Sequence, residues 1–358
     1  MSNEEFIHGG DIYTHGILKG KKLIDFSSNI NPLGVPSGFK ENIEEAFEMV
    51  ERYPDIKYRE LKDNIIKYLY KYWGATLEHK NLILGNGASE IIDLSIRRLK
   101  RVVIPAPAFS EYSISCEKWG CEIINSALLS NMDYNYEDII LKLEKADGVI
   151  LGNPNNPNGG ILNNDKFKEI LDLCEEKNKL VIVDEAFIEF AEENATVINY
   201  LKKYRSLIII RALTKFFAVP GIRFGYGITF NDEVIKYMNE NQNPWNINSF
   251  AELCVKYALI DEEYINNSKA WIRKEKEYML KELNNINIIR QVYITHSNYI
   301  LCRLKTCDCE ELYSYCFKNG IVIRRGNNFT GLNNEYVRFA IKNRELNDNL
   351  INTLKAFK

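Results

Sequence analysis

The stretch SLIIIRALTKFFAVPGIRFGYGITF at residues 206–230 contains two short apolar runs, separated by a connection rich in turn-forming residues. Runs of this length and composition predict buried β-strands at about 206–213 and 223–230. Lys215 lies two residues after the end of the first run, and Arg223 stands eight residues later. Because ligands of open parallel sheets bind where the strands end, we expect this connection to face a site.

The same pattern extends towards the N-terminus. Five more apolar runs occur at 81–85, 101–105, 121–127, 147–154 and 179–187. Most are separated by amphipathic segments of helical length, such as residues 164–178. This alternation predicts an α/β fold whose large domain holds a mainly parallel seven-stranded sheet with helices on both faces.

The pattern changes at both ends of this region. The first 40 residues are rich in turn formers and predict an extended arm, followed by helices near 39–50 and 58–73. After residue 245 we expect a helical stretch at 248–285, strands near 298–304, 320–326 and 336–341, and helices near 309–319 and 344–357. The predicted organisation is an N-terminal arm (1–40), a large domain (41–245) and a small α+β domain (246–358).

Composition excludes several classes of protein. Of 358 residues, 46% are apolar and 27% are charged, which is ordinary for a globular protein. The 46 basic and 49 acidic residues give a net charge of −3, so we expect neither nucleic acid nor an anionic membrane as a partner. No apolar run approaches the roughly 18 residues of a membrane span. The start MSNEEFIHGG lacks the features of a signal peptide, so we expect a cytoplasmic protein.

The eight cysteines predict neither disulfides nor a metal site. A chain of this length buries a large core without disulfides. The densest cluster, CRLKTCDCEELYSYC ending at Cys316, lacks the C-x-x-C pair of most structural zinc sites. We therefore expect reduced thiols.

Two loops that follow predicted strands have unusual sequences. GNGASE at 85–90 would begin a helix, whose N-terminal N–H groups suit a phosphate, although a plain turn is the alternative. Glu90 stands where a dinucleotide fingerprint needs its third glycine, and the sequence contains no G-K-[ST] P-loop. GNPNNPNGG at 152–160 offers several asparagine amides, each both donor and acceptor.

Charged residues end two other predicted strands. Asp184 ends an apolar run, where a carboxylate needs a cation, several donors or a helix to cap. Lys215 alone is more typical of a surface lysine. Together with Arg223, these residues match the needs of an aldehyde cofactor that has a pyridine ring and a phosphate. Such a cofactor uses a lysine for a Schiff base, a carboxylate for the ring nitrogen, and an arginine with a helix N-terminus for its phosphate.

The order of these motifs resembles a known family. GNGASE, PAF at 107–109, NPNNPNG, VDEAF and the pattern TK-x(4)-PG-x-R at 214–223 are similar to the fold-type-I pyridoxal phosphate (PLP) enzymes. The resemblance is to the family that contains histidinol-phosphate aminotransferase and threonine-phosphate decarboxylase, and it covers nearly the whole chain. It implies PLP as cofactor, a homodimer, and catalytic roles for Lys215 and Asp184.

The resemblance also implies a role for each residue of the site. Lys215 would form the Schiff base, and Asp184 would pair with the ring nitrogen. The other cofactor-binding residues would be Asn156 at the ring hydroxyl, Phe109 on the ring face, Gly87, Ala88, Ser89, Thr214 and Arg223 at the phosphate, and Tyr53 at the phosphate of the neighbouring subunit's cofactor. Two positions depart from many transaminases of the family, because Phe187 replaces a tyrosine and Ala212 replaces a serine or threonine.

The arm is most similar to the threonine-phosphate decarboxylase branch of the family. HGGDIY at 8–13 and DFSSNINPLG at 25–34 carry this resemblance, and Phe187 is normal in that branch. It implies decarboxylation of L-threonine O-3-phosphate to (R)-1-amino-2-propanol O-2-phosphate in cobalamin biosynthesis. The substrate-binding residues would be His8, Gly9, Asn29, Asn156, Arg324 and Arg338, with Arg338 holding the α-carboxylate through a bidentate fork.

Three alternatives remain beside this expectation. A histidinol-phosphate or other aminotransferase would need a keto acid as its second substrate. A PLP-binding transcription regulator would need a DNA-binding domain of roughly 70 residues, whereas the arm is short and not basic. A non-enzymatic α/β binding module would hold no cofactor and would therefore not be yellow.

Overall fold

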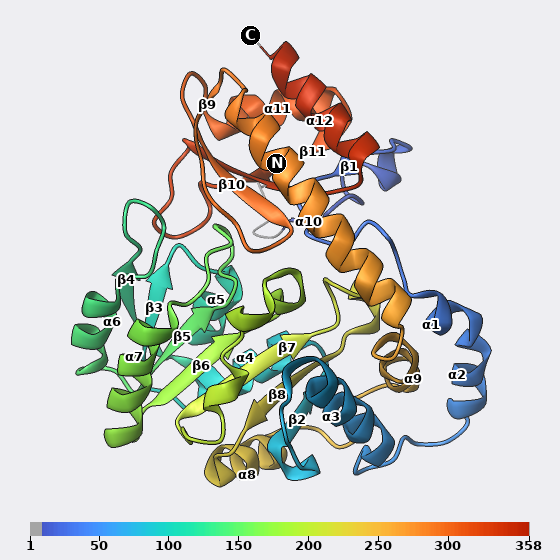
Figure 1. Cartoon of the computed structure of the whole chain (residues 1–358), viewed down its shortest axis with the longest axis vertical. Helices are drawn as coiled ribbons and strands as arrows, with labels where there is room; N and C mark the ends of the chain where they lie inside the picture. Colours follow the sequence, from blue (N-terminus) through green and yellow to red (C-terminus); the bar gives the residue numbers. More distant parts are fainter. Residues whose placement is uncertain (1–8, 358) are drawn as a thin grey trace.

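The computed structural model describes residues 9–357, and its framework is a large seven-stranded sheet with a smaller sheet packed beside it (Figure 1). The strand order in the large sheet is β2-β8-β7-β6-β5-β3-β4. The strands are β2 (Leu82–Gly85), β3 (Arg101–Ala106), β4 (Glu122–Ala127), β5 (Gly148–Gly152), β6 (Leu180–Asp184), β7 (Leu207–Ala212) and β8 (Gly225–Thr229). Pairing is parallel except at β8, which is antiparallel to β2 and β7. The α/β class and the mainly parallel sheet are thus confirmed.

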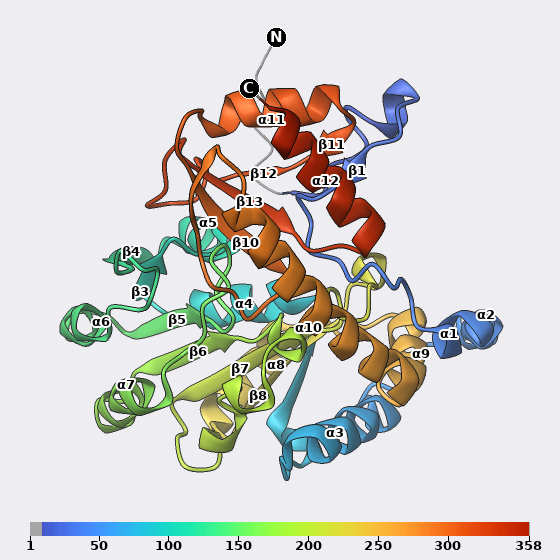
Figure 2. The ribbon, with the colours of Figure 1, turned by 45° about the horizontal axis from the view of Figure 1, so that its top comes forward.

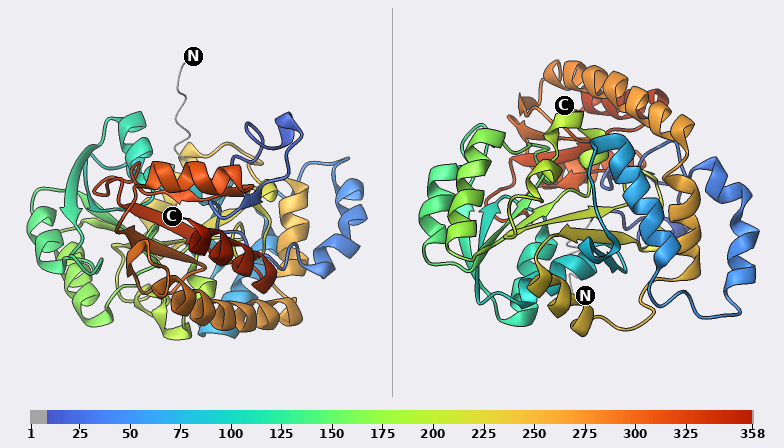
Figure 3. Two further views of the ribbon diagram at one scale, coloured as in Figure 1. Left: turned by 90° about the horizontal axis from the view of Figure 1, so that it is seen from above. Right: turned by 60° about the horizontal axis from the view of Figure 1, so that its bottom comes forward.

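Helices cover both faces of the large sheet. Its central strands β5, β6 and β7 are therefore buried at every position. Successive side chains of a strand point to opposite faces. Ile182 and Ile208 pack in one core with α4 (Ala88–Arg97), α5 (Ser110–Trp119) and α8 (Asp232–Asn241). Val183 and Ile209 pack in the other core, which includes α3 (Arg59–Trp73), α6 (Tyr136–Leu143) and α7 (Asn164–Glu176). Figure 3 shows helices on both sides of the sheet.

The smaller sheet has four antiparallel strands in the order β12-β13-β10-β9 (Figure 2). They are β9 (Ile289–Val292), β10 (Tyr299–Leu304), β12 (Arg324–Arg325) and β13 (Tyr336–Ala340), accompanied by helices α10 (Glu262–Asn284), α11 (Cys309–Lys318) and α12 (Arg344–Ala356). The strands predicted near 298–304 and 336–341 and both C-terminal helices agree with these bounds. β9 was not predicted, because its partly exposed residues show no apolar run.

Three predicted elements are divided in the structure. The helical stretch expected at 248–285 is α9 (Ser249–Ala258) followed by α10, because Asp261 caps the second helix by accepting a hydrogen bond from the Tyr264 N–H at 2.9 Å. The helix expected at 39–50 is likewise two short helices, and the strand expected at 320–326 is two short strands. These pieces are α1 (Ser37–Glu41), α2 (Ile43–Met49), β11 (Ile321–Val322) and β12.

The N-terminal arm contains little regular structure, and it contacts both the small domain and the loop that follows β7. Its strand β1 (Ile24–Asp25) pairs in parallel with β11. The Asn31 N–H donates to the main-chain oxygen of Lys215 at 3.1 Å, which fixes the arm beside the end of β7. The domain boundaries at residues 40 and 245 remain predictions.

The cysteines are unpaired, and seven of the eight are buried. Cys302, at the start of the sequence cluster, lies fully buried in β10 as part of the core. Between residues 9 and 357, no group of three or more His, Cys, Asp or Glu side chains is placed to hold a metal ion. Within the same range no helix is both long and apolar enough to cross a membrane.

Candidate active site

A pocket of about 450 Å³ opens where the central strands of the large sheet end, and its walls also include the small sheet and the arm. It brings together most of the residues that the sequence predicted. These are Gly9, Asn29, Ala88, Ser89, Phe109, Asn156, Asp184, Thr214, Lys215, Arg223, Arg324 and Arg338. This arrangement agrees with the expectation that the loops after the strands form one site. The role of each residue in that site remains a prediction.

Asp184 is the last residue of β6, and its side chain is buried. Its Oδ2 accepts a hydrogen bond from the Tyr112 hydroxyl at 2.8 Å, and its Oδ1 accepts one from the Ala186 N–H at 3.0 Å. Burial raises the pKa of the carboxyl, and both hydrogen bonds oppose that shift. A protonated nitrogen brought to this carboxylate would compensate its desolvation.

Tyr112 is a site residue that the sequence reasoning missed. It lies in the first turn of α5, three residues after Phe109, and its ring contacts the Phe109 ring edge-on at 5.8 Å. Both side chains line the pocket. Residues three apart share a face of a helix. Since Phe109 was predicted to face the cofactor from the start of this helix, Tyr112 could have been predicted to face it as well.

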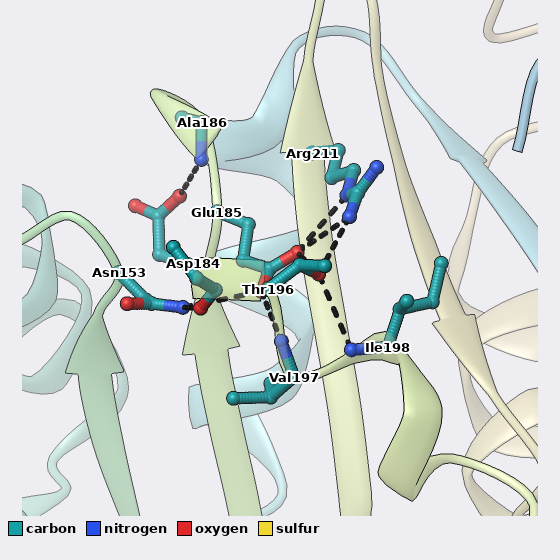
Figure 4. Close-up of polar contacts among 9 residues, drawn as sticks. Asn153, Asp184, Glu185, Ala186, Thr196, Val197, Ile198 and Arg211 are labelled. Carbon is teal, nitrogen blue, oxygen red and sulfur yellow. Dashed lines mark hydrogen bonds and ion pairs between the residues drawn. The ribbon is translucent and has the colours of Figure 1, made fainter. Parts of the chain in front are cut away.

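A buried ion pair supports the strand ends beside Asp184 (Figure 4). Glu185 Oε2 accepts from Arg211 Nε at 3.0 Å and from Arg211 NH2 at 2.8 Å, and both side chains are fully buried. The second oxygen, Oε1, accepts from the Val197 N–H at 2.8 Å, and Thr196 Oγ1 donates to Oε2 at 2.8 Å. This network links β6, β7 and the loop between them.

Breaking this ion pair is expected to destabilise the fold. Glu185→Ala leaves the Arg211 guanidinium buried without its carboxylate, so the free energy of unfolding should fall by about 3–5 kcal/mol. Urea denaturation measures the change. The matched control is Glu240→Ala, which removes an exposed pair with Lys236 and should alter stability by about 1 kcal/mol or less. If both variants lost the same free energy of unfolding, the buried Glu185–Arg211 pair would not have the stabilising role given to it here.

Lys215 follows β7 and presents its amine to the pocket. Burial, together with the nearby positive charges of Arg338 and Lys342, lowers the pKa of the amine to about 8. Its Nζ lies 5.9 Å from the centre of the Phe187 ring. Within the described chain no hydrogen bond to this Nζ is found, so the amine faces the cavity as a weak base that is partly neutral near pH 8.

The start of α4 and Arg223 form a cradle for an anion. α4 begins at Ala88, and the first N–H groups of a helix have no acceptor inside the helix. Arg223 NH2 donates to Ser89 Oγ at 3.3 Å. A Cβ at Gly87 would lie 2.5 Å from Arg223 NH2, so the guanidinium occupies space that only glycine leaves free. Arg223 itself has a left-handed φ of 59°, a strained conformation that is common at functional sites.

Arg324 and Arg338 form a second cationic wall on neighbouring strands. They are directly opposite each other in the antiparallel pair β12–β13, and both are buried. Burial lowers the pKa of Arg338 to about 10, and burial with the charge of Arg338 lowers that of Arg324 to about 9. Arg338 NH1 donates to Asn156 Oδ1, whereas its buried Nε has no partner in the described structure. An anionic ligand at this wall would offset the repulsion between the two guanidinium groups.

Three predicted residues stand apart from the pocket wall. Gly87 lies behind it, against Arg223. Tyr53 is 77% exposed and its ring lies against the Trp245 ring at a tilt of 33°, with ring centres 4.6 Å apart, away from the pocket of its own chain. His8 lies outside the described residues, although Gly9, the next residue, lines the pocket.

Comparison with known proteins gives this geometry its context. The family model described as aminotransferase class I and II matches residues 21–354. The chain belongs to the class I and II aminotransferase family. Pyridoxal phosphate is the cofactor of this family, and this chain is PLP-dependent.

Individual relatives of this aminotransferase-family chain carry two kinds of name. A Caldanaerobacter subterraneus protein named "Putative threonine-phosphate decarboxylase" is 40% identical over 98% of this chain and 93% of its own. The threonine-phosphate decarboxylase of Salmonella typhimurium is 32% identical over 97% of this chain and 95% of its own. A solved structure named as the histidinol-phosphate aminotransferase from Clostridium acetobutylicum is 48% identical, with a TM-score of 0.89 over 93% of this chain and 98% of that chain.

The pocket fits PLP on three observations. The cradle at Gly87 and Arg223 suits a phosphate. Asp184 is a buried carboxylate, and a protonated ring nitrogen would offset the desolvation that raises its pKa. The lowered pKa of Lys215 favours its neutral amine, which is the form that bonds an aldehyde.

The pH dependence of cofactor uptake should report the pKa of Lys215. Only the neutral amine bonds an aldehyde, and burial favours that form by lowering the pKa below its free value. Uptake of PLP by the apoprotein should therefore accelerate with rising pH, with a midpoint near pH 8, and level off only at higher pH. Visible absorbance followed over a pH series measures the rate. A midpoint near 10, typical of a free lysine, would contradict the prediction.

Gly87→Ala should weaken binding of the cofactor phosphate. The added Cβ would displace the Arg223 guanidinium, and the φ of +85° is unfavourable for alanine. We expect the dissociation constant for PLP to rise by about 10- to 100-fold, corresponding to about 1.4–2.8 kcal/mol. Gly74→Ala is the matched control, because its φ is +64° but a Cβ there meets nothing within 4 Å. If both variants bind PLP equally, the cradle is not at Gly87.

Proposed function

We propose that this chain decarboxylates L-threonine O-3-phosphate to (R)-1-amino-2-propanol O-2-phosphate, a step of cobalamin biosynthesis. The observation that carries the proposal is the pair of buried arginines, Arg324 and Arg338, on one wall of the pocket. This wall is separate from the anion cradle at Gly87 and Arg223, which suits the cofactor phosphate. Two guanidinium groups beside each other match a substrate with both a carboxylate and a phosphate. Histidinol phosphate carries a phosphate but no carboxylate.

The arm gives independent support. Gly9, Ser27, Ser28 and Asn29 all line the pocket, and they belong to the two arm motifs that resemble the decarboxylase branch. The Oδ1 of Asn29 is buried without a partner among the described residues. It is therefore available to a donor group of a ligand, such as a substrate amine.

The residues have distinct parts in the proposed reaction. PLP, when bound, supplies an electron sink for the negative charge left when a bond to the substrate α-carbon breaks. The carboxylate of Asp184 would stabilise the positive charge of a protonated nitrogen in the cofactor ring. Arg338 binds the carboxylate that is to leave, and thereby orients the bond that breaks. Lys215, which lines the same pocket, would deliver a proton from Nζ to the α-carbon after carbon dioxide leaves.

A histidinol-phosphate aminotransferase is the second candidate. The 48% identity to the Clostridium acetobutylicum structure favours it. The same arginine wall would then bind the phosphate of one substrate and the carboxylates of the other.

Two parallel reactions with the PLP-loaded protein separate the candidates. L-threonine O-3-phosphate is supplied alone in the first, and histidinol phosphate with 2-oxoglutarate in the second. We expect the phosphorylated aminopropanol in the first tube and no glutamate in the second. Glutamate formation without any aminopropanol product would overturn the proposal in favour of the aminotransferase.

We also propose that the protein works as a homodimer in which Tyr53 of each subunit reaches the cofactor phosphate of the other. The exposure of Tyr53 and of Trp245 supports this idea, because exposed aromatic side chains are enriched at interfaces. Sedimentation of the purified protein tests it, and a monomeric mass with full activity would contradict it.

A further inference from the structure

Asp25 is the last residue of β1. The strand that carries it is fixed on two sides. The Phe26 N–H donates to the Val322 main-chain oxygen at 2.8 Å, and the Phe26 oxygen accepts from the Ala340 N–H at 2.9 Å. Asp25 is therefore anchored between β11 and the end of β13, next to Arg338.

Asp25 organises the turn that follows it. Its Oδ1 accepts from the Ser27 N–H at 2.7 Å, from Ser27 Oγ at 2.6 Å and from the Ser28 N–H at 3.2 Å. Its Oδ2 accepts from the Ser28 hydroxyl. Both carboxylate oxygens are thus used within one turn, and a carboxylate that accepts several hydrogen bonds holds its donors in a fixed geometry.

The carbonyls of this turn orient two cations. The Ser27 oxygen accepts from Arg338 NH2 at 2.6 Å, and the Ser28 oxygen accepts from Lys342 Nζ at 3.1 Å. In the described part of the chain, no ion pair within 4 Å joins Asp25 to either cation. The Arg338 Nε consequently stays unpartnered, which leaves the guanidinium able to bind a substrate carboxylate.

The same turn holds the beginning of the described arm. Ser27 Oγ accepts from the Gly10 N–H at 2.8 Å. A Cβ at Gly9 would lie 2.3 Å from the Ser27 oxygen, so the arm passes directly over the carbonyl that Arg338 uses. One turn therefore connects the arm to the cationic wall.

We propose that Asp25 is a positioning residue that fixes the Ser27–Ser28 turn and thereby aims Arg338 at the substrate carboxylate while anchoring the arm over the pocket. The proposal deepens the proposed function and rests on it for the identity of the substrate. Charge contributes as well, because Asp25 faces Lys215, Arg338 and Lys342 and favours the protonated form of each. An indirect contact of this kind stabilises the arginine without competing with the substrate for its donors.

The test compares Asp25→Ala and Asp25→Asn with Asp308→Ala in the PLP-loaded protein. Asp308 is the matched control, because it also accepts two main-chain N–H hydrogen bonds, from Glu310 and Glu311, but lies away from the pocket. We expect Asp25→Ala to raise the KM for L-threonine O-3-phosphate by about 10- to 100-fold, with a smaller fall in kcat. Asp25→Asn should recover most of that KM, because an amide oxygen still accepts from both serine N–H groups.

A second readout does not depend on the substrate. Trypsin cleavage after Lys19, Lys21 or Lys22 should be faster in Asp25→Ala than in Asp308→Ala, because the turn no longer holds the arm. A KM and a cleavage rate that both match the control would overturn the proposal. If the wild type turns over histidinol phosphate instead, the proposed function fails. The positioning role of Asp25 is then tested by the KM for histidinol phosphate and by the rate of trypsin cleavage. If the wild type uses neither substrate, cleavage alone decides.

Discussion

Replacing Lys215 by alanine is expected to reduce kcat for L-threonine O-3-phosphate by about 10³-fold or more. The residue has two tasks in the proposed reaction, which are to hold the cofactor covalently through Nζ and to deliver a proton to the α-carbon. Loss of a positioned proton donor alone typically lowers rates by about 10²–10⁴-fold. Among the described residues no other lysine lines the pocket, and the nearby Lys342 directs its Nζ to the Ser28 oxygen, so we expect no other amine to substitute for it.

Two measurements accompany that variant. Borohydride reduction of the wild type followed by mass spectrometry should locate the cofactor on Lys215, and the alanine variant should carry none. Lys236→Ala is the control, because this lysine is an exposed residue of α8 and its loss should leave kcat unchanged. Cofactor found on another lysine, or a fall in kcat of less than about tenfold, would show that the chemistry lies elsewhere.

Replacing Arg338 by alanine should lower kcat/KM for the same substrate by about 10²–10³-fold. The side chain is buried and forms the only contact we propose for the substrate carboxylate, and truncating one member of a buried, hydrogen-bonded charge pair costs about 2–5 kcal/mol. Arg338→Lys should recover only part of the loss, because an ammonium cannot reproduce the planar fork of a guanidinium.

The control for the arginine is Arg303→Ala. Arg303 lies on β10 and pairs with Glu335 through Nε at 2.7 Å, outside the pocket wall. Its removal should change kcat/KM less than threefold, corresponding to about 0.6 kcal/mol. Steady-state kinetics of the three variants therefore separate loss of substrate binding from loss of general stability. Similar kinetics for Arg338→Ala and Arg303→Ala would contradict a role in binding the carboxylate.

Much of the fold could be predicted from the sequence, because the central strands are apolar throughout and the helices between them are amphipathic. Elements whose formation depends on tertiary contacts were missed or divided. β9 is partly exposed and lacks the apolar pattern of a strand, and it exists because β10 supplies its hydrogen bonds. Asp261 divides the long helical stretch by a single capping bond, which hydrophobic periodicity does not reveal.

The site was predictable where function places unusual residues at strand ends, as with Asp184 and Lys215. It was not predictable where residues act through contacts between distant segments. The Tyr112 hydroxyl meets Asp184 across 72 positions of sequence, and Arg338 meets the Ser27 carbonyl across 311. No local pattern marks such pairs, because the strand order of the sheets decides which loops meet.

The most direct test of the central claim is the fate of the substrate carboxyl group. The purified PLP-loaded protein is given L-threonine O-3-phosphate that is isotopically labelled in the carboxyl carbon, with no keto acid present. We predict labelled carbon dioxide in an amount equal to the substrate consumed, together with the phosphorylated aminopropanol. Retention of the label in the organic fraction, with amino transfer from glutamate to imidazole acetol phosphate in a parallel sample, would contradict the account and identify an aminotransferase.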